Sequence, residues 1–113
     1  MEEKVTAIYL LVWKHELRAA DEGSYERPLA AQREKCLKFI TEKGINDLKI
    51  NFYTSRSDLF RDVERDLVAR LVINDIGRLA ASPGDLEGAL FELKMRNVDV
   101  LCVEEREEKG KSR

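Results

Sequence analysis

The sequence predicts a three-layer α/β domain, with a mostly parallel central sheet of about four strands and helices on both faces. Two observations carry this prediction. Apolar runs with the length of buried strands alternate with segments whose apolar residues recur every three or four positions, as in amphipathic helices. In addition, 113 residues fit one domain, and right-handed crossovers in the order β-α-β-α-β-α-β place helices on both faces.

The first predicted strand covers residues 5–13, whose nearly continuous apolar and β-branched side chains are typical of a strand buried on both faces. A long polar segment, residues 14–27, follows it and is therefore expected at the carboxyl edge of the sheet. This segment contains the single histidine, His15, together with Glu16 and Asp21. We expect a solvated loop here, and acid–base chemistry is the alternative.

The clearest helix is predicted over residues 28–44, because Pro28 suits a first turn and Gly44 the position after a last turn. One side of this helix carries Leu29, Arg33, Cys36 and Ile40. Residues 48–54 then alternate between apolar and polar side chains, which indicates a half-buried strand at or near an edge of the sheet.

A short helix is predicted next, with Ser55 or Ser57 as its N-cap. Apolar residues spaced by three and four mark its buried side: Leu59, Phe60, Val63 and Leu67. A third strand follows near residues 67–73. Arg78 lies just beyond the exit of that strand, where open parallel sheets place their ligands.

Residues 71–105 are predicted to form one βαβ unit, which completes the sheet. Ser82, with Asp85 three residues on and Pro83 between them, indicates the start of a helix that Asn97 ends. The core side of this helix is formed by Leu86, Ala89, Leu90 and Leu93. Phe91 and Met95 lie off that side, either at the helix flank or in a contact surface, and residues 98–103 form the last strand.

Composition excludes several classes of protein. A net charge of -2 does not favour non-specific binding to nucleic acid. Cys36 and Cys102 belong to no metal-binding spacing, so we expect two reduced, buried thiols, no metal and no cofactor. Neither a secretory leader nor a membrane span of about 18 apolar residues is evident, so we expect a cytoplasmic protein without a membrane partner. Residues 1–104 form the predicted domain, and residues 105–113 a charged, flexible tail.

The stretch 71–105 resembles the N-terminal catalytic domain of serine recombinases, the resolvase/invertase family. In that family a strand leads into Asp-Arg-Leu-Gly-Arg and then Ser or Thr, and here the corresponding run from Gly77 to Ser82 is GRLAAS. The run Gln32-Arg33-Glu34 resembles the family's first helix, and the run from Ser55 to Leu59, SRSDL, resembles the arginine-bearing start of its second. The resemblance implies a resolvase-like fold over nearly the whole chain.

The chain departs from the family at the positions that carry its chemistry. The family's first strand ends in Tyr-Ala-Arg-Val-Ser, whose serine attacks DNA, whereas here the run is YLLVW. Trp13 therefore takes the place of the nucleophile, Leu11 that of an arginine, and Ala81 that of the second arginine of the later motif. Because strand cleavage needs a hydroxyl and several cations, the resemblance implies an inactive domain. We expect Trp13 to fill the space that the smaller nucleophile leaves in the family.

Part of the family's polar set remains, namely Arg56, Arg78, Gln32 and, as a further candidate, Arg65. These residues predict a residual site for an anion or the DNA backbone. The alternative is that the arginines are paired with nearby acids: Asp58, Asp62, Glu64 or Asp75.

The main hypothesis is a catalytically inactive, resolvase-like interaction or regulatory module, associated with DNA or a mobile element. One alternative is a small-ligand or phosphoryl-group enzyme that uses the loop after the first strand together with Arg78. Another is non-catalytic binding of the DNA backbone through Arg56, Arg65 and Arg78. The family's dimerisation helix and DNA-binding module do not follow in these 113 residues, so a homodimer is expected to use another surface, with the predicted edge strand 48–54 as the candidate.

Overall fold

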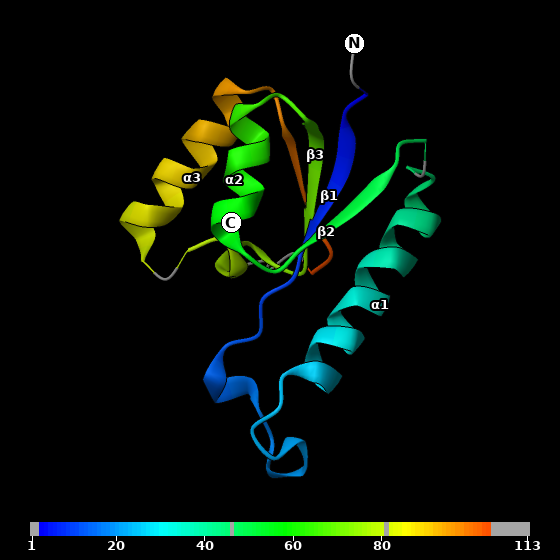
Figure 1. Ribbon diagram of the computed structural model, residues 1–113, viewed down its shortest axis with the longest axis vertical. Coiled ribbons are helices and arrows are strands. Elements are labelled where there is room, and N and C mark those ends of the chain that lie inside the picture. The colour runs from blue at the N-terminus through cyan, green and yellow to red at the C-terminus, as the bar shows by residue number, and fades with distance from the viewer. Residues whose placement is uncertain (1–2, 46, 81, 105–113) are drawn as a thin grey trace, which may run out of the picture.

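The computed structural model describes residues 3–45, 47–80 and 82–104. Within these residues the chain forms a four-stranded parallel sheet in the order β2-β1-β3-β4. Helix α1 (Glu26–Lys43) covers one face, while α2 (Arg56–Glu64) and α3 (Pro83–Met95) cover the other (Figure 1). This is the predicted three-layer α/β arrangement. The strands are β1 (Val5–Tyr9), β2 (Ile50–Tyr53), β3 (Val68–Ile73) and β4 (Asp99–Cys102).

The core consists of two apolar layers, one on each face of the sheet. Successive strand residues point to opposite faces, so Ala7 packs in one layer and Ile8 in the other. The layer beneath α2 and α3 contains Leu59, Val63, Leu71, Ile73 and Leu93, and the layer beneath α1 contains Ile8, Cys36, Ile40 and Val72. Every residue of β1 is buried, as predicted for a central strand.

Strand β1 is shorter than predicted, because a side chain replaces its strand neighbour. It ends at Tyr9, and the Leu10 amide makes one further bond to the carbonyl of Tyr53. At Leu11 the side-chain amide of Gln32 replaces the neighbouring strand as the hydrogen-bond partner. Its Oε1 accepts from the Leu11 N–H at 3.0 Å, and its Nε2 donates to the Leu11 carbonyl at 2.9 Å. The extension of this strand to residue 13 was therefore wrong.

Helix α1 begins two residues before the predicted start and ends as predicted at Gly44, which adopts the left-handed conformation at φ 67°. Its buried side chains are Gln32, Cys36 and Ile40, so the placement of Arg33 on that side was wrong. Arg33 is exposed, with its guanidinium 4.4 Å from the ring centre of Phe52 on the edge strand β2. Burial raises the pKa of the Cys36 thiol to about 11, which makes it unreactive.

The edge position predicted for residues 48–54 is confirmed by β2. At its end Tyr53 is buried and donates from its hydroxyl to Asp62 on α2 at 2.6 Å. Burial, with this bond as the second cause, raises the pKa of Tyr53 to about 12. Phe52, which shares the other side of the strand with Ile50, is 39% exposed.

The predicted helix starts on the second face are confirmed. Ser55 caps α2 by accepting from the Asp58 amide at 3.3 Å, and Ser82 caps α3 by accepting from the Asp85 amide at 3.2 Å. Asn97 follows α3 at φ 58°, as expected of a residue that ends a helix. Leu67 is only half-buried, because α2 ends at Glu64 and the chain turns before β3 begins.

The remaining predictions concern the exposed apolar residues of α3, the two cysteines, the charged tail and membrane-spanning segments. Phe91 and Met95 are 65% and 64% exposed, so they do not pack at the helix flank. Cys36 is fully buried as predicted, whereas Cys102 is only half-buried. The predicted tail at 105–113 lies outside the described residues. Over the parts that the structure describes, no helix combines the length and the apolar character needed to cross a membrane.

Candidate functional site

A cavity opens at the carboxyl edge of the sheet, where its topology changes direction. From β1 the chain crosses over through α1 to β2 on one side, whereas β3 lies on the other side of β1. Open α/β sheets bind ligands at such a switch point. The edge cavity, as we call it, has a volume of about 350 Å³ and is lined by Val12, Glu16, Arg18, Asp21, Arg27, Pro28, Ala31, Gln32, Lys35, Asn74 and Arg78.

Arg78 is the most tightly held cation of this cavity. It ends a short 3-10 turn (Ile76–Arg78) after β3, and its side chain is buried. Both terminal nitrogens bind one carboxylate: Nη1 donates to Glu16 Oε1 at 2.5 Å and Nη2 to Glu16 Oε2 at 2.7 Å. Nη1 also donates to the Leu11 carbonyl at 2.9 Å, and Nε donates to Asp75 Oδ2 at 3.2 Å. All three guanidinium nitrogens thus donate to protein acceptors.

Glu16 belongs to the polar segment after β1, which the structure orders into two 3-10 turns, Lys14–Glu16 and Ala19–Asp21. Besides binding Arg78, its Oε1 accepts from the Trp13 amide at 2.7 Å, which closes the first turn. The hydrogen bonds from Arg78 hold the pKa of Glu16 below its usual range, and burial opposes them to a smaller extent. The same bonds raise the pKa of Arg78. Both groups are therefore charged at neutral pH.

Asp21 anchors the second turn and lies at the wall of the cavity. Its Oδ2 accepts from the Arg18 amide at 2.9 Å, and its Oδ1 lies 3.5 Å from Nε of Arg27 in the first turn of α1. Oδ1 of Asp21 and Oδ1 of Asn74 are buried without a hydrogen-bond partner among the described residues. The segment expected to be a solvated loop is therefore built around two carboxylates that point inward.

The structure separates the histidine from these carboxylates. Glu16 and Asp21 line the cavity, but His15 is exposed and is absent from its lining. Among the residues that the structure describes, no three or more His, Cys, Asp and Glu side chains gather where they could hold a metal ion. Trp13 is half-buried and does not line the cavity.

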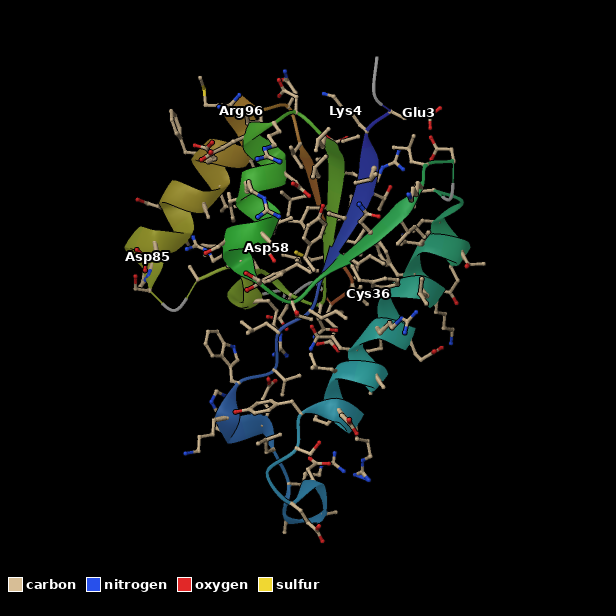
Figure 2. The ribbon with its side chains drawn as sticks, viewed as in Figure 1. Glu3, Lys4, Cys36, Asp58, Asp85 and Arg96 are labelled. Atoms are coloured by element: carbon tan, nitrogen blue, oxygen red, sulfur yellow. The ribbon has the colours of Figure 1, made fainter. Side chains whose placement is uncertain are left out.

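The three candidate arginines do not meet on one surface. Arg78 is buried in the cavity beside Gln32, whereas Arg56 begins α2 with its guanidinium 5.1 Å from the ring centre of Phe60. Arg65 follows the last residue of α2, at the opposite end of that helix from Arg56. Figure 2 labels Asp58, which lies in the first turn of α2 close to Arg56 in the sequence. Ala81, the other family position, lies outside the described residues.

Four polar lining residues were not singled out in the sequence: Arg18, Arg27, Lys35 and Asn74. For three of them the sequence does hold a signal. Arg27, Ala31 and Lys35 recur at a spacing of four, which places them on one side of a helix next to Pro28 and Gln32. Asn74 directly follows a buried strand, so its position at the carboxyl edge could also be predicted. The contribution of Arg18 depends on the fold of its loop, for which the sequence gives no comparable signal.

No protein-family model matches this chain, and a search of curated proteins finds no match either. Solved structures do match. The C-terminal catalytic domain of ISC1926 TnpA, an IS607-like serine recombinase, is 19% identical with a TM-score of 0.67, over 91% of this chain and 72% of that one. The first open reading frame of transposon ISC1904 from Sulfolobus solfataricus P2 is 14% identical with a TM-score of 0.64, over 95% and 72%.

A resolvase family site-specific recombinase from Streptococcus pneumoniae is also similar, with 20% identity and a TM-score of 0.61 over 89% of this chain and 72% of that one. At such identities the likeness concerns the fold. It agrees with the resolvase-like architecture that the sequence predicted, with a four-stranded parallel sheet and helices on both faces.

Proposed function

We propose that this chain is a recombinase-like domain that does not cleave DNA and that serves as an interaction or regulatory module associated with DNA or a mobile element. One observation carries the proposal: Glu16 fills the fork of Arg78 with a bidentate carboxylate. A guanidinium that is neutralised in this way has little charge left to stabilise a phosphorane.

The substitution at the nucleophile position supports the same conclusion. By the resemblance, Trp13 stands where the family has its serine, and an indole offers no oxygen that can attack a phosphodiester. Gln32 is likewise committed to the backbone of Leu11 by two hydrogen bonds. The family-like polar residues around β1 are thus used to hold the chain together.

The mobile-element setting rests on the solved structures of similar fold, whose descriptions name a transposon and an IS607-like serine recombinase. Because fold alone does not determine function, this setting belongs to the proposal. The geometry does not favour DNA-backbone binding by Arg56, Arg65 and Arg78, since two of them lie at opposite ends of α2 and the third is paired internally. The enzyme alternative lacks its expected base, because His15 is outside the cavity.

A DNA-adduct assay tests the loss of cleavage. The purified protein is incubated with supercoiled DNA carrying recombination sites of an IS607-like element, and covalent adducts are resolved on a denaturing gel. The Streptococcus pneumoniae recombinase with its own site serves as the positive control. We expect no adduct from the wild-type chain, and an adduct that survives denaturation would overturn the proposal.

A pair of variants tests the role assigned to Arg78. Trp13→Ser restores a hydroxyl but leaves Arg78 bound to Glu16, so we expect no adduct from this single variant. The double variant Trp13→Ser/Glu16→Gln removes the charged competitor as well. An adduct from the single variant would show that the Glu16–Arg78 pair does not block the chemistry, which would remove the main support for the proposal.

A further inference from the structure

The solvent side of α3 carries apolar and small residues where a surface helix normally carries charged ones. Gly84, Gly88, Phe91 and Met95 are all exposed, and their spacing of four, three and four residues places them on one side of the helix. Phe91 and Met95 are 65% and 64% exposed. Single exposed apolar residues need no explanation, but these two are neighbours one turn apart. We call the side formed by these four residues the α3 face.

The packing of the chain does not require the two glycines of the α3 face. A Cβ atom at Gly84 or Gly88 would meet no side chain or more distant backbone atom within 4 Å, and neither glycine has a positive φ. Gly88 lies inside α3, where glycine is less favourable than alanine. Such a position suits the close approach of a second molecule, because a glycine leaves room for a large side chain.

The chain supplies no apolar cover for the α3 face. Figure 1 shows α3 at the margin of the molecule, with α2 beside it on the inner side. Within the described residues the face stays open, since Phe91 and Met95 are exposed. Of the residues outside the described ranges, only Met1 and Ala81 are apolar. An apolar cover therefore has to come from another molecule.

A second copy of the same face fits this surface when the two helices run antiparallel. A two-fold axis midway between Gly88 and Phe91 sets Phe91 of each copy against Gly88 of the other. The same axis sets Met95 of each copy against Gly84 of the other, because these two residues have the same midpoint. Each large apolar side chain thus faces the space that a glycine leaves.

The charges beside the α3 face favour the same arrangement. Glu87 and Lys94 lie seven residues apart along one flank of the face, and both are exposed. Neither forms an ion pair with a residue that the structure describes. In the antiparallel pair, Glu87 of each copy lies near Lys94 of the other, with an offset of about 3 Å along the axis that a lysine side chain spans. A parallel pair would instead bring the two Glu87 carboxylates together.

We infer that two copies of the chain associate through the α3 face as an antiparallel, two-fold symmetric helix pair. The contact is small, because α3 has 13 residues and is therefore about 20 Å long. Interfaces below about 1,200 Å² are typical of weak association, so we expect a dimer that forms at micromolar or higher concentration. The inference does not rest on the proposed function, since self-association needs no DNA.

Sedimentation velocity of the full chain, from about 1 µM to 1 mM, tests the inference. We expect the wild type to pass from monomer to dimer and to stop there, because an interface of this symmetry is closed. Phe91→Ala should weaken dimerisation about tenfold or more. Phe52→Ala truncates the exposed phenylalanine of the rival surface, β2, and should change dimerisation less than about twofold. A wild type that stays monomeric, or a dimer that Phe91→Ala leaves intact, would overturn the inference.

Charge reversal tests the antiparallel register. Glu87→Lys and Lys94→Glu each bring like charges together at two symmetric points, so either variant alone should dimerise about tenfold more weakly than wild type. An equimolar mixture of the two should form a heterodimer, because each reversed residue then faces its opposite charge. Glu64→Lys, at an exposed position of α2, is the control for net charge and should dimerise like wild type. Two weakened variants that do not pair with each other would overturn the inference.

The Gly88→Gln variant separates the contact from the stability of the helix. Glutamine has the higher helix propensity, so thermal unfolding of the monomer at about 1 µM should shift to higher temperature. The added side chain fills the space assigned to Phe91 of the other copy, so dimerisation should weaken at the same time. A variant that dimerises as strongly as wild type would contradict the close approach at Gly88 and overturn the inference.

Discussion

Gln32 performs at one residue the role that a neighbouring strand performs elsewhere in the sheet. Its side-chain amide pairs with both backbone polar groups of Leu11, at the point where β1 leaves its partners. An amide side chain has both a donor and an acceptor, so it satisfies the two groups at once. The chain can therefore leave the sheet while its buried backbone groups stay paired.

The first prediction concerns this amide. Gln32→Ala leaves the partly buried Leu11 amide without a partner and the Leu11 carbonyl with only its bond from Arg78, so we expect the free energy of unfolding to fall by about 1–3 kcal/mol. Urea denaturation followed by circular dichroism measures the change. Lys38→Ala, at an exposed position of the same helix, is the control. Equal stability of Gln32→Ala and wild type would show that water replaces the amide without loss.

The second prediction concerns the Glu16–Arg78 pair and its dependence on pH. The folded-state pKa of Glu16 is lowered by Arg78, so its contribution to stability is present above its unfolded pKa of about 4.3 and is lost as the pH falls through the folded value. We expect Glu16→Gln to be less stable than wild type at pH 7 by about 1–3 kcal/mol. The difference should shrink as the pH falls below about 4.

Urea denaturation at pH 7 and at low pH measures this difference. Glu87→Gln, on the exposed side of α3, is the control and should behave like wild type at both values. A gap between wild type and Glu16→Gln that stays constant with pH would contradict the role assigned to the carboxylate.

At the scale of the helices, the start of α2 shows which of two serines is the N-cap, a choice that the sequence did not decide. Ser55 precedes the helix and accepts from the Asp58 amide, while Ser57 lies within the first turn and is exposed. A cap satisfies an amide that has no partner inside the helix. Only one of the two serines therefore stabilises the start of α2.

The third prediction follows from that difference. Ser55→Ala should lower the free energy of unfolding by about 1 kcal/mol through loss of the cap. Ser57→Ala should leave it unchanged or raise it slightly, because alanine has the higher helix propensity. Thermal and urea denaturation of the two variants side by side measures the contrast. Equal effects of the two substitutions, or a larger effect of Ser57→Ala, would contradict the assignment of the cap to Ser55.

The element scale also shows what the sequence could predict. The caps at Ser55 and Ser82, the helix end at Asn97 and the glycine after α1 are signals that residues a few positions apart create, and the structure confirms them. The end of β1 was wrong because Gln32, 21 residues from Leu11, decides it.

The candidate site shows the same limit more strongly. The position of Arg78 at the strand exit and the neighbouring acid Asp75 were predicted. The main partner of Arg78 is Glu16, 62 residues away, and nothing in the local sequence pairs them. Likewise, the spacing of Arg27, Ala31 and Lys35 predicts that they share one side of a helix. It does not predict that the loop after β1 lies next to that side.

For the whole molecule, the open question is how its exposed apolar residues are used in assembly. Edge strand β2 presents Phe52, and α3 presents Phe91 and Met95 on the same face of the sheet as α2. Exposed edge strands pair readily with a second chain unless they are protected. Here the guanidinium of Arg33 lies over the ring of Phe52 and partly covers that side chain.

The fourth prediction distinguishes the two surfaces. If the chain forms a homodimer through β2, then Phe52→Lys should convert it to a monomer, whereas Phe91→Lys on α3 should leave the dimer intact. Size-exclusion chromatography with light scattering over a range of protein concentrations measures the mass. The reverse pattern would assign the interface to α3, and a monomeric wild type would remove the expectation of a homodimer.

The order of the strands has a consequence for the synthesis of this protein. β1 is the second strand of the sheet in space but the first to leave the ribosome, and its partners on both sides come later in the chain. β1 cannot pair with a neighbouring strand on both sides until Val68–Ile73 has emerged. The nascent chain therefore carries this buried apolar strand without one of its two neighbours until β3 has emerged, which makes early chaperone contact valuable to it.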